Sequence, residues 1–173
     1  MSIGAVAVAA VVGIVASKHL HRPAAEPALP LTVTRPFERF PDATRLRLQQ
    51  RIRLAYFAAA PLGTRLIIEL DGNNPGQEHL AAELLQACLR ASIMTRVYQR
   101  PPEPQFSEPQ QHVRIICHPI AEPFSQALLR TLATFIDIGQ TTVQLDPQLL
   151  PGVARIELRG RVELKDDGSV AVR

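Results

Sequence analysis

The sequence predicts an α/β fold in which two consecutive β-α-β units form a small, mostly parallel sheet. An antiparallel hairpin is expected at the C-terminal edge of this sheet, and an N-terminal transmembrane helix is expected before it. Three observations lead to this prediction. Short apolar runs rich in β-branched residues alternate with helical segments between residues 65 and 145. Charged and apolar residues alternate with a period of two over residues 155–164, and residues 2–17 contain no charge.

The N-terminal segment, residues 1–21, is predicted to be a single transmembrane anchor. Extending its uncharged run to Leu20 gives a helix of about 28 Å, close to the roughly 30 Å thickness of the hydrocarbon core. A cleaved signal peptide and a buried soluble helix are the alternatives, although no basic residue precedes the run as a signal peptide would require. Basic residues follow the run, so the positive-inside rule places the body of this single-pass protein on the cytoplasmic side of the cell membrane.

Small residues recur at every fourth position of this segment. Such a spacing lets two helices approach closely in lipid, although a segment so rich in Ser, Gly and Ala also produces the stripe by chance. The expected membrane-helix packing residues are Ala5, Ala9, Gly13 and Ser17.

A Pro-rich linker is predicted over residues 22–42, because its five prolines prevent a helix and favour an extended chain. A basic amphipathic helix follows over residues 43–61 and ends at Pro61. Its apolar side is expected to pack on the body. Its arginines are then either solvated or in contact with anionic lipid headgroups. These arginines are Arg45, Arg47, Arg51 and Arg53.

The formal net charge of +3 conceals an uneven distribution. Residues 18–60 carry eight basic and three acidic residues, whereas the remainder has more acids than bases. A nucleic-acid binder carries its positive charge on the folded body, and stacked aromatic surfaces are disfavoured by an aromatic content of 5% with no Trp. Binding of nucleic acid through the arginine-rich helix is therefore the weakest of the functional alternatives.

The α/β body is expected over residues 62–173 and contains the two β-α-β units. Each strand-helix-strand segment makes a parallel pair with a right-handed crossover. The predicted elements are a strand at 65–70, a helix at 77–91 and a strand at 95–99, then a strand at 113–117, a helix at 124–136 and a strand at 141–145.

The final stretch is predicted to be an edge ribbon. Residues 155–164 alternate polar and apolar residues, which is typical of a strand with one face in water. Residues 165–168 form a turn signal, and residues 170–172 return as the second strand of a hairpin. A long strand with charges on one face suits the edge of a sheet, and a partner-docking surface is the alternative.

A ligand site is conceivable only if the first strands of the two units are neighbours. Their carboxyl ends and a helix N-terminus would then form one crevice for a small anion, or for His118 acting as an acid-base group oriented by Asp71. The favoured interpretation is structural, with Asp71 and Asn73 capping a turn and His118 half-exposed in a loop. The candidate ligand-binding residues are Asp71, Asn73, Asn74, Gly76 and His118.

Reactive motifs are otherwise scarce, so no catalytic residue, cofactor or metal site is predicted. Neither lysine of the chain lies near the crevice, and Cys88 and Cys117 fall on apolar faces. The leading functional hypothesis is a membrane-anchored, non-enzymatic binding or assembly module, such as a sensor or accessory subunit. Its partners would be the lipid bilayer and a protein or a second copy of the chain. A small anionic-ligand receptor or hydrolase-type enzyme using the Asp71/His118 crevice is the alternative.

Overall fold

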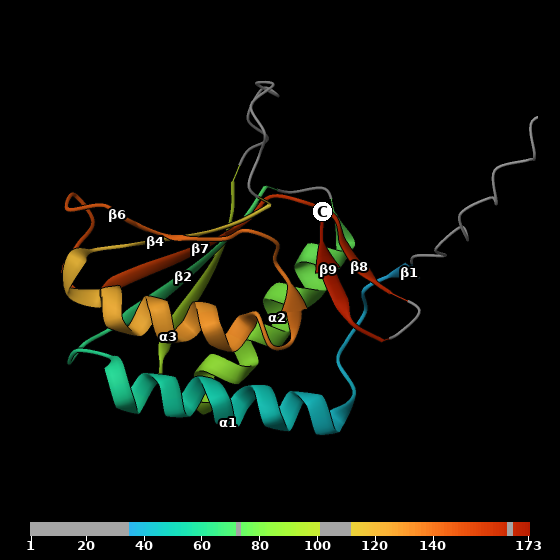
Figure 1. Cartoon of the computed structure of the whole chain (residues 1–173), viewed down its shortest axis with the longest axis horizontal. Helices are drawn as coiled ribbons and strands as arrows, with labels where there is room; N and C mark the ends of the chain where they lie inside the picture. The colour runs from blue at the N-terminus through green and yellow to red at the C-terminus, as the bar shows by residue number, and fades with distance from the viewer. Residues whose placement is uncertain (1–34, 72–73, 101–111, 166–167) are drawn as a thin grey trace, which may run out of the picture. The chain divides into compact units, whose positions relative to one another are not determined.

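A computed structural model describes residues 35–71, 74–100, 112–165 and 168–173, which form a mixed α/β body with two sheets (Figure 1). The predicted anchor lies outside these ranges, as do its packing residues Ala5, Ala9, Gly13 and Ser17. Within the described ranges, every helix is too short or too polar to cross a bilayer.

Both predicted β-α-β units are present in the body. In the first, β2 (Arg65–Leu70) and β3 (Met94–Gln99) are parallel neighbours joined by α2 (Pro75–Arg90). In the second, β4 (Val113–Cys117) and β6 (Val143–Leu145) are parallel neighbours. The short helix η1 (Pro119–Ala121) and the helix α3 (Glu122–Leu132) connect this second pair.

The prediction of an antiparallel C-terminal edge is wrong, because β7 (Val153–Leu158) lies in the middle of the larger sheet. The strand order is β3-β2-β7-β4-β6, with β7 parallel to β2 and antiparallel to β4. The apolar side of β7 faces the helices through Ala154, Ile156 and Leu158, which are all buried. Both edges of β7 are therefore paired, and the first strands of the two units are not neighbours.

A second, four-stranded sheet has the order β1-β8-β9-β5. The predicted strand over 155–164 is interrupted, because the chain leaves the larger sheet after β7 and enters the second sheet at β8 (Val162–Leu164). Gly160 lies at this crossing, where a Cβ atom would collide with the carbonyl oxygen of Arg173. The predicted hairpin forms between β8 and β9 (Val170–Val172), but in the second sheet. The outer strands are β1 (Arg35–Pro36) and β5 (Ile136–Asp137).

The body begins inside the predicted linker. Pro36 already belongs to β1, and the side chains of Phe37 and Phe40 are 0% and 3% exposed. Their rings stack edge to face with centroids 4.9 Å apart. Two buried aromatic rings bind this segment to the core, so residues 35–41 do not act as a spacer.

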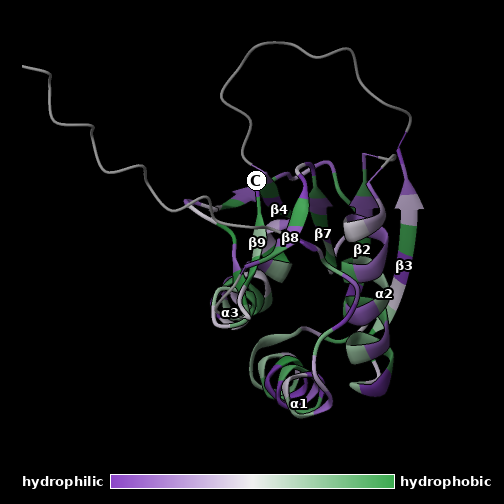
Figure 2. Cartoon of the chain, turned by 90° about the vertical axis from the view of Figure 1, so that its right-hand side faces the viewer, coloured by the Kyte–Doolittle hydropathy of each residue, from purple (hydrophilic) through white to green (hydrophobic). Residues whose placement is uncertain are grey.

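Three layers make up the body, as Figures 1 and 2 show. Helices α2 and α3 cover one face of the larger sheet, and α1 (Asp42–Ala59) crosses beneath both of them. On α1, Leu48 and Ile52 are buried, and the ring of Tyr56 meets that of Phe124 on α3 edge to face. The opposite face of the larger sheet is not covered by any helix in the described ranges.

Candidate functional site

The predicted crevice between Asp71 and His118 is not formed. Asp71 follows Leu70 at the end of β2, and Leu70 pairs with Leu158, the last residue of β7. His118 follows β4, which runs the other way, so that Cys117 pairs with Ala154 near the start of β7. The two side chains therefore lie at opposite ends of the sheet, because Asp71 is level with Arg159 and His118 with Val153, which are about 20 Å apart along the strand. The insertion of β7 is the physical reason that the two do not meet.

The N-terminus of α2 is capped by its own chain and packs against the second sheet. Asn74 caps the helix, because its side-chain oxygen accepts a hydrogen bond of 3.0 Å from the backbone N–H of Gly76. The Gly76 backbone lies directly against β8, and a Cβ atom there would collide with the carbonyl oxygen of Val162. The buried side chain of Gln77 donates to the carbonyl oxygen of Gly160 over 2.6 Å. The backbone N–H groups of Gly76, Gln77 and Glu78 all donate to Asn74, so these donors already have partners within the protein. Asn73 lies outside the described residues.

His118 also has a structural partner. Its Nδ1 accepts a hydrogen bond of 3.2 Å from the backbone N–H of Ile120, which caps η1. Its own backbone N–H donates to the carbonyl oxygen of Val153 over 3.0 Å. The imidazole thus holds the turn between β4 and α3, and the carboxylate proposed to orient it is at the other end of the sheet.

The two cysteines are free and buried. Burial raises the pKa of the Cys88 thiol to about 12, and burial also raises the pKa of Cys117. Because the thiolate is the reactive form, both side chains behave as small apolar core residues near neutral pH. The described residues also contain no group of three or more His, Cys, Asp and Glu side chains that could hold a metal ion.

The helix-free face of the larger sheet carries a cluster of charges that the sequence pattern places in water. At its centre, Glu157 on β7 is only 3% exposed. Its carboxylate lies 2.7 Å from Arg159 Nη2 and 3.6 Å from Arg114 Nη1. Arg155 bridges this carboxylate to that of Glu69 on β2, with N–O distances of 3.5 Å and 3.3 Å.

This cluster offers little space for a ligand. The cavity beside Glu69, Asp71 and Glu157 has a volume of about 10 Å³, which is the size of one water molecule. Its carboxylates and its guanidinium groups lie against one another, so the charges of the cluster compensate one another. The alternation of Arg and Glu over 155–159 is the sequence signal for it. The same alternation is produced by a solvated edge strand, so the pattern could not distinguish the two.

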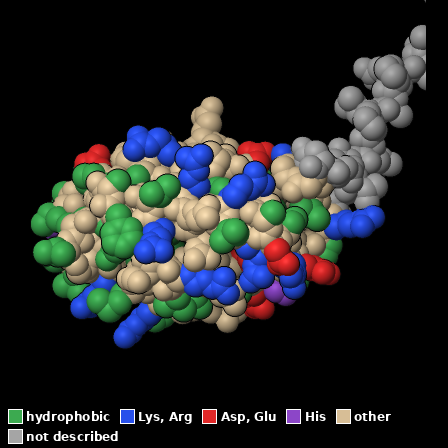
Figure 3. All heavy atoms as spheres, turned by 90° about the horizontal axis from the view of Figure 1, so that it is seen from below, with side chains coloured by type: hydrophobic (Ala, Val, Ile, Leu, Met, Phe, Trp, Pro, Cys, Tyr) green, Lys and Arg blue, Asp and Glu red, His purple; other side chains and the backbone are tan. Residues whose placement is uncertain are grey.

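The outer side of α1 exposes large apolar side chains together with basic ones. Three large apolar side chains stand in solvent there: Leu46 is 53%, Leu54 is 64% and Phe57 is 67% exposed. Exposed arginines are interspersed with them, and the guanidinium of Arg53 lies 5.5 Å from the ring centre of Phe57. Figure 3, which views the body from below, shows apolar and basic side chains mixed over this side. We call this surface the α1 outer face: Leu46, Arg47, Arg51, Arg53, Leu54 and Phe57.

Arg45 does not belong to the α1 outer face, although the sequence groups it with the other arginines. Its Nε lies 2.8 Å from the carboxylate of Glu83 on α2, and its Nη2 donates to Gln86 over 2.7 Å. This side chain joins α1 to α2. Asp42 is the only acidic residue of α1 and lies at the first position of the helix, so the rest of the helix has no negative charge.

The chain matches no protein family, no curated protein and no solved structure with which it was compared.

Proposed function

We propose that the protein is a membrane-associated binding module whose body rests on an anionic lipid surface through the α1 outer face. The observation that carries this proposal is the mixture of exposed apolar and basic side chains on one side of α1. Leucine and phenylalanine side chains enter the boundary between headgroups and acyl chains, while guanidinium groups bind lipid phosphates. A surface of this kind needs both components, and α1 presents them on one side.

Two further features support this proposal. The α1 outer face lies on the side of the body opposite the larger sheet, so lipid contact leaves that sheet accessible (Figure 2). The uncharged segment over residues 2–17 is suited to a transmembrane anchor, and the basic residues that follow it favour a cytoplasmic body. An anchor raises the local concentration of the body at the bilayer, so that a weak surface contact becomes effective.

The test measures binding of the full-length protein to vesicles of phosphatidylcholine alone and to vesicles that also contain phosphatidylglycerol. We expect tighter binding to the anionic vesicles, since each arginine near such a surface contributes about 1 kcal/mol. The double variant Arg47→Gln/Arg51→Gln should then lose about 30-fold in its preference for anionic vesicles. Leu54→Ser/Phe57→Ser should weaken binding to both kinds of vesicle.

A matched control removes two arginines elsewhere. Arg130 on α3 and Arg161 before β8 are exposed and lie outside the α1 outer face. Arg130→Gln/Arg161→Gln has the same net charge as the test variant and should bind almost as the wild type does. Equal losses in the two double variants, or equal binding to neutral and anionic vesicles, would contradict the proposed contact. The anchor is tested separately, by extraction of native membranes with alkaline carbonate, which should leave the protein in the pellet.

A further inference from the structure

The outer edge of β3 is a feature that lipid contact through α1 leaves unexplained. β3 is the first strand in the order of the larger sheet, and no strand of the described residues pairs with its outer side. It is six residues long, whereas β6 at the opposite edge has three. Proteins usually protect such edges with short strands, prolines or bulges, because unpaired N–H and C=O groups recruit other strands. β3 has no proline and pairs with β2 in unbroken register over all six residues.

Alternation along β3 identifies the backbone groups that face outward. The N–H of Arg100, just after the strand, donates to the carbonyl oxygen of Leu70 on β2. Because consecutive residues of a strand direct their backbone groups to opposite sides, Thr95, Val97 and Gln99 direct theirs away from β2. These three residues therefore form the free edge of the sheet.

An apolar groove lies beside this edge. It has a volume of about 410 Å³, and its lining includes Met94, Tyr98, Leu89 and Leu150. All four side chains are strongly exposed, between 47% and 68%. A groove of this size accepts several side chains of an added strand, since those side chains point alternately toward and away from it.

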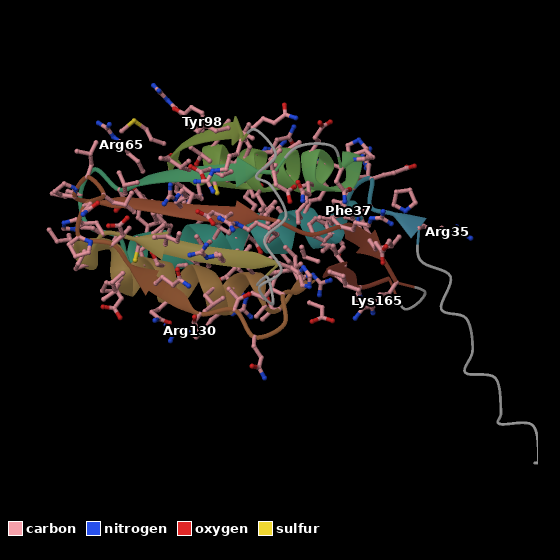
Figure 4. The ribbon with its side chains drawn as sticks, turned by 90° about the horizontal axis from the view of Figure 1, so that it is seen from above. Arg35, Phe37, Arg65, Tyr98, Arg130 and Lys165 are labelled. Atoms are coloured by element: carbon pink, nitrogen blue, oxygen red, sulfur yellow. The ribbon has the colours of Figure 1, made fainter. Side chains whose placement is uncertain are left out.

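The charge beside the groove indicates the partner. Arg65 and Arg96 line it, are exposed, and have no acidic partner among the described residues. Glu69 lies on the same side of the sheet, but its carboxylate is held by Arg155 at 3.3 Å. Figure 4 looks onto this face, with Arg65 and Tyr98 both on the side where β3 lies. Pairing with a second copy of β3 would bring Arg96 close to its own counterpart, and like charges in adjacent positions oppose that arrangement.

We propose that the free edge of β3 binds an acidic, extended segment of a partner protein, which adds to the larger sheet as a sixth strand. Backbone groups of Thr95, Val97 and Gln99 pair with the added strand. Apolar side chains of the partner occupy the groove, and its carboxylates bind Arg65 and Arg96. This inference is independent of the lipid contact, which uses other residues, those of the α1 outer face.

The test uses two fluorescent synthetic peptides of about eight residues, which is long enough to pair along the whole of β3. One alternates Glu with Val, and the other alternates Lys with Val. We expect the Glu peptide to bind the full-length protein in detergent, and the Lys peptide to bind at least about 10-fold more weakly. Amide hydrogen exchange at Thr95, Val97 and Gln99 should slow when the Glu peptide is added.

Two variants examine the backbone and the charge separately. Val97→Pro removes an outward N–H, which an edge strand tolerates, and should reduce binding at least about 10-fold while the circular dichroism spectrum is retained. Arg65→Gln/Arg96→Gln leaves the backbone intact and should reduce binding by a similar factor, so the inference remains testable if Val97→Pro does not fold. Arg130→Gln/Arg161→Gln is the control and should bind as the wild type does.

Three results would overturn the inference. The first is equal affinity for the Glu and Lys peptides, and the second is no saturable binding of the Glu peptide below about 1 mM. The third is a dimer in sedimentation that Val97→Pro abolishes, which would assign the edge to a second copy of the chain. None of these results bears on the lipid contact, because the vesicle variants alter α1 and the peptide variants alter the sheet.

Discussion

Replacing Glu157 with Gln should destabilise the body strongly, although the sequence pattern places this charge in water. Glu157 belongs to β7, the central strand, and only 3% of it is exposed. The substitution keeps the shape of the side chain and removes its charge. Arg159, Arg155 and Arg114 then lose the carboxylate that lies within 2.7–3.6 Å of them.

The expected loss of stability follows from how deeply Glu157 and its arginine partners are buried. Removing one partner of a fully buried ion pair costs about 3–5 kcal/mol, because an uncompensated charge is left behind. The side chains of Arg114, Arg155 and Arg159 are between 20% and 29% exposed, so water replaces part of the lost interaction. We therefore expect a loss of about 2–3 kcal/mol in the free energy of unfolding. For a domain of this size the corresponding fall in Tm is about 4–12 °C.

Urea unfolding of the full-length protein in mild detergent, followed by far-ultraviolet circular dichroism, measures this loss. The control is Glu38→Gln, an exposed residue before α1, which should change the free energy of unfolding by less than about 0.5 kcal/mol. The double variant Glu157→Gln/Arg159→Gln should lose less free energy of unfolding than the sum of the two single variants, because Arg159 is then no longer left without its carboxylate. A loss for Glu157→Gln no larger than that of the control would refute the reasoning, since it would mean that the cluster is solvated.

Two further predictions concern the core. Gly76→Ala should lower the free energy of unfolding by about 2–3 kcal/mol in the same assay, because the added methyl group meets the Val162 carbonyl oxygen and α2 must shift away from β8. Gly63→Ala is the control. Its methyl group meets no atom, so it should lower the free energy of unfolding by only about 1 kcal/mol, for the positive φ of 78°. The second prediction concerns the Cys88 thiol, whose pKa is about 12 in the fold and 9 ordinarily. Above pH 9 the unfolded chain releases the thiol proton, whereas the folded chain keeps it. The free energy of unfolding should therefore fall above pH 9, by up to about 1.4 kcal/mol per pH unit. Cys88→Ala should be less sensitive over this range, and a slope equal to that of the wild type would show that the thiol titrates normally in the fold.

The elements of the body could be predicted from local patterns. The strand ranges 65–70 and 113–117 coincide with β2 and β4, because apolar runs bounded by Gly, Pro and Asn leave few alternatives. The two crossover helices were also expected, and Leu80 and Leu84, which are four positions apart in the sequence, are both buried on α2. Their ends differ by several residues, as for α3, which begins at Glu122 and ends at Leu132. Capping and the last turn depend on neighbouring elements, which a periodicity does not contain.

The candidate site was less accessible to prediction than the elements. The arginines of α1 are evident in the sequence, but the pairing of Arg45 with Glu83 joins residues 38 positions apart. Asn74 and Gly76 have the composition of an anion-binding turn, and the structure uses them to seat α2 against β8. A turn of this composition can either bind an anion or pack against another element, and only the tertiary structure distinguishes the two roles.

The sequence by itself determined the two β-α-β units, because periodicity and turn residues act over a few neighbouring positions. The tertiary structure decided the strand order, since placing β7 between β2 and β4 depends on pairing between residues more than 80 positions apart, such as Ile68 and Ile156. That placement buries Glu157 among arginines, separates Asp71 from His118, and leaves β3 at the edge of the larger sheet as the described residues form it. Alternating charge along a strand has the same appearance in an edge and in a centre. Its meaning is set by the neighbours that the fold supplies.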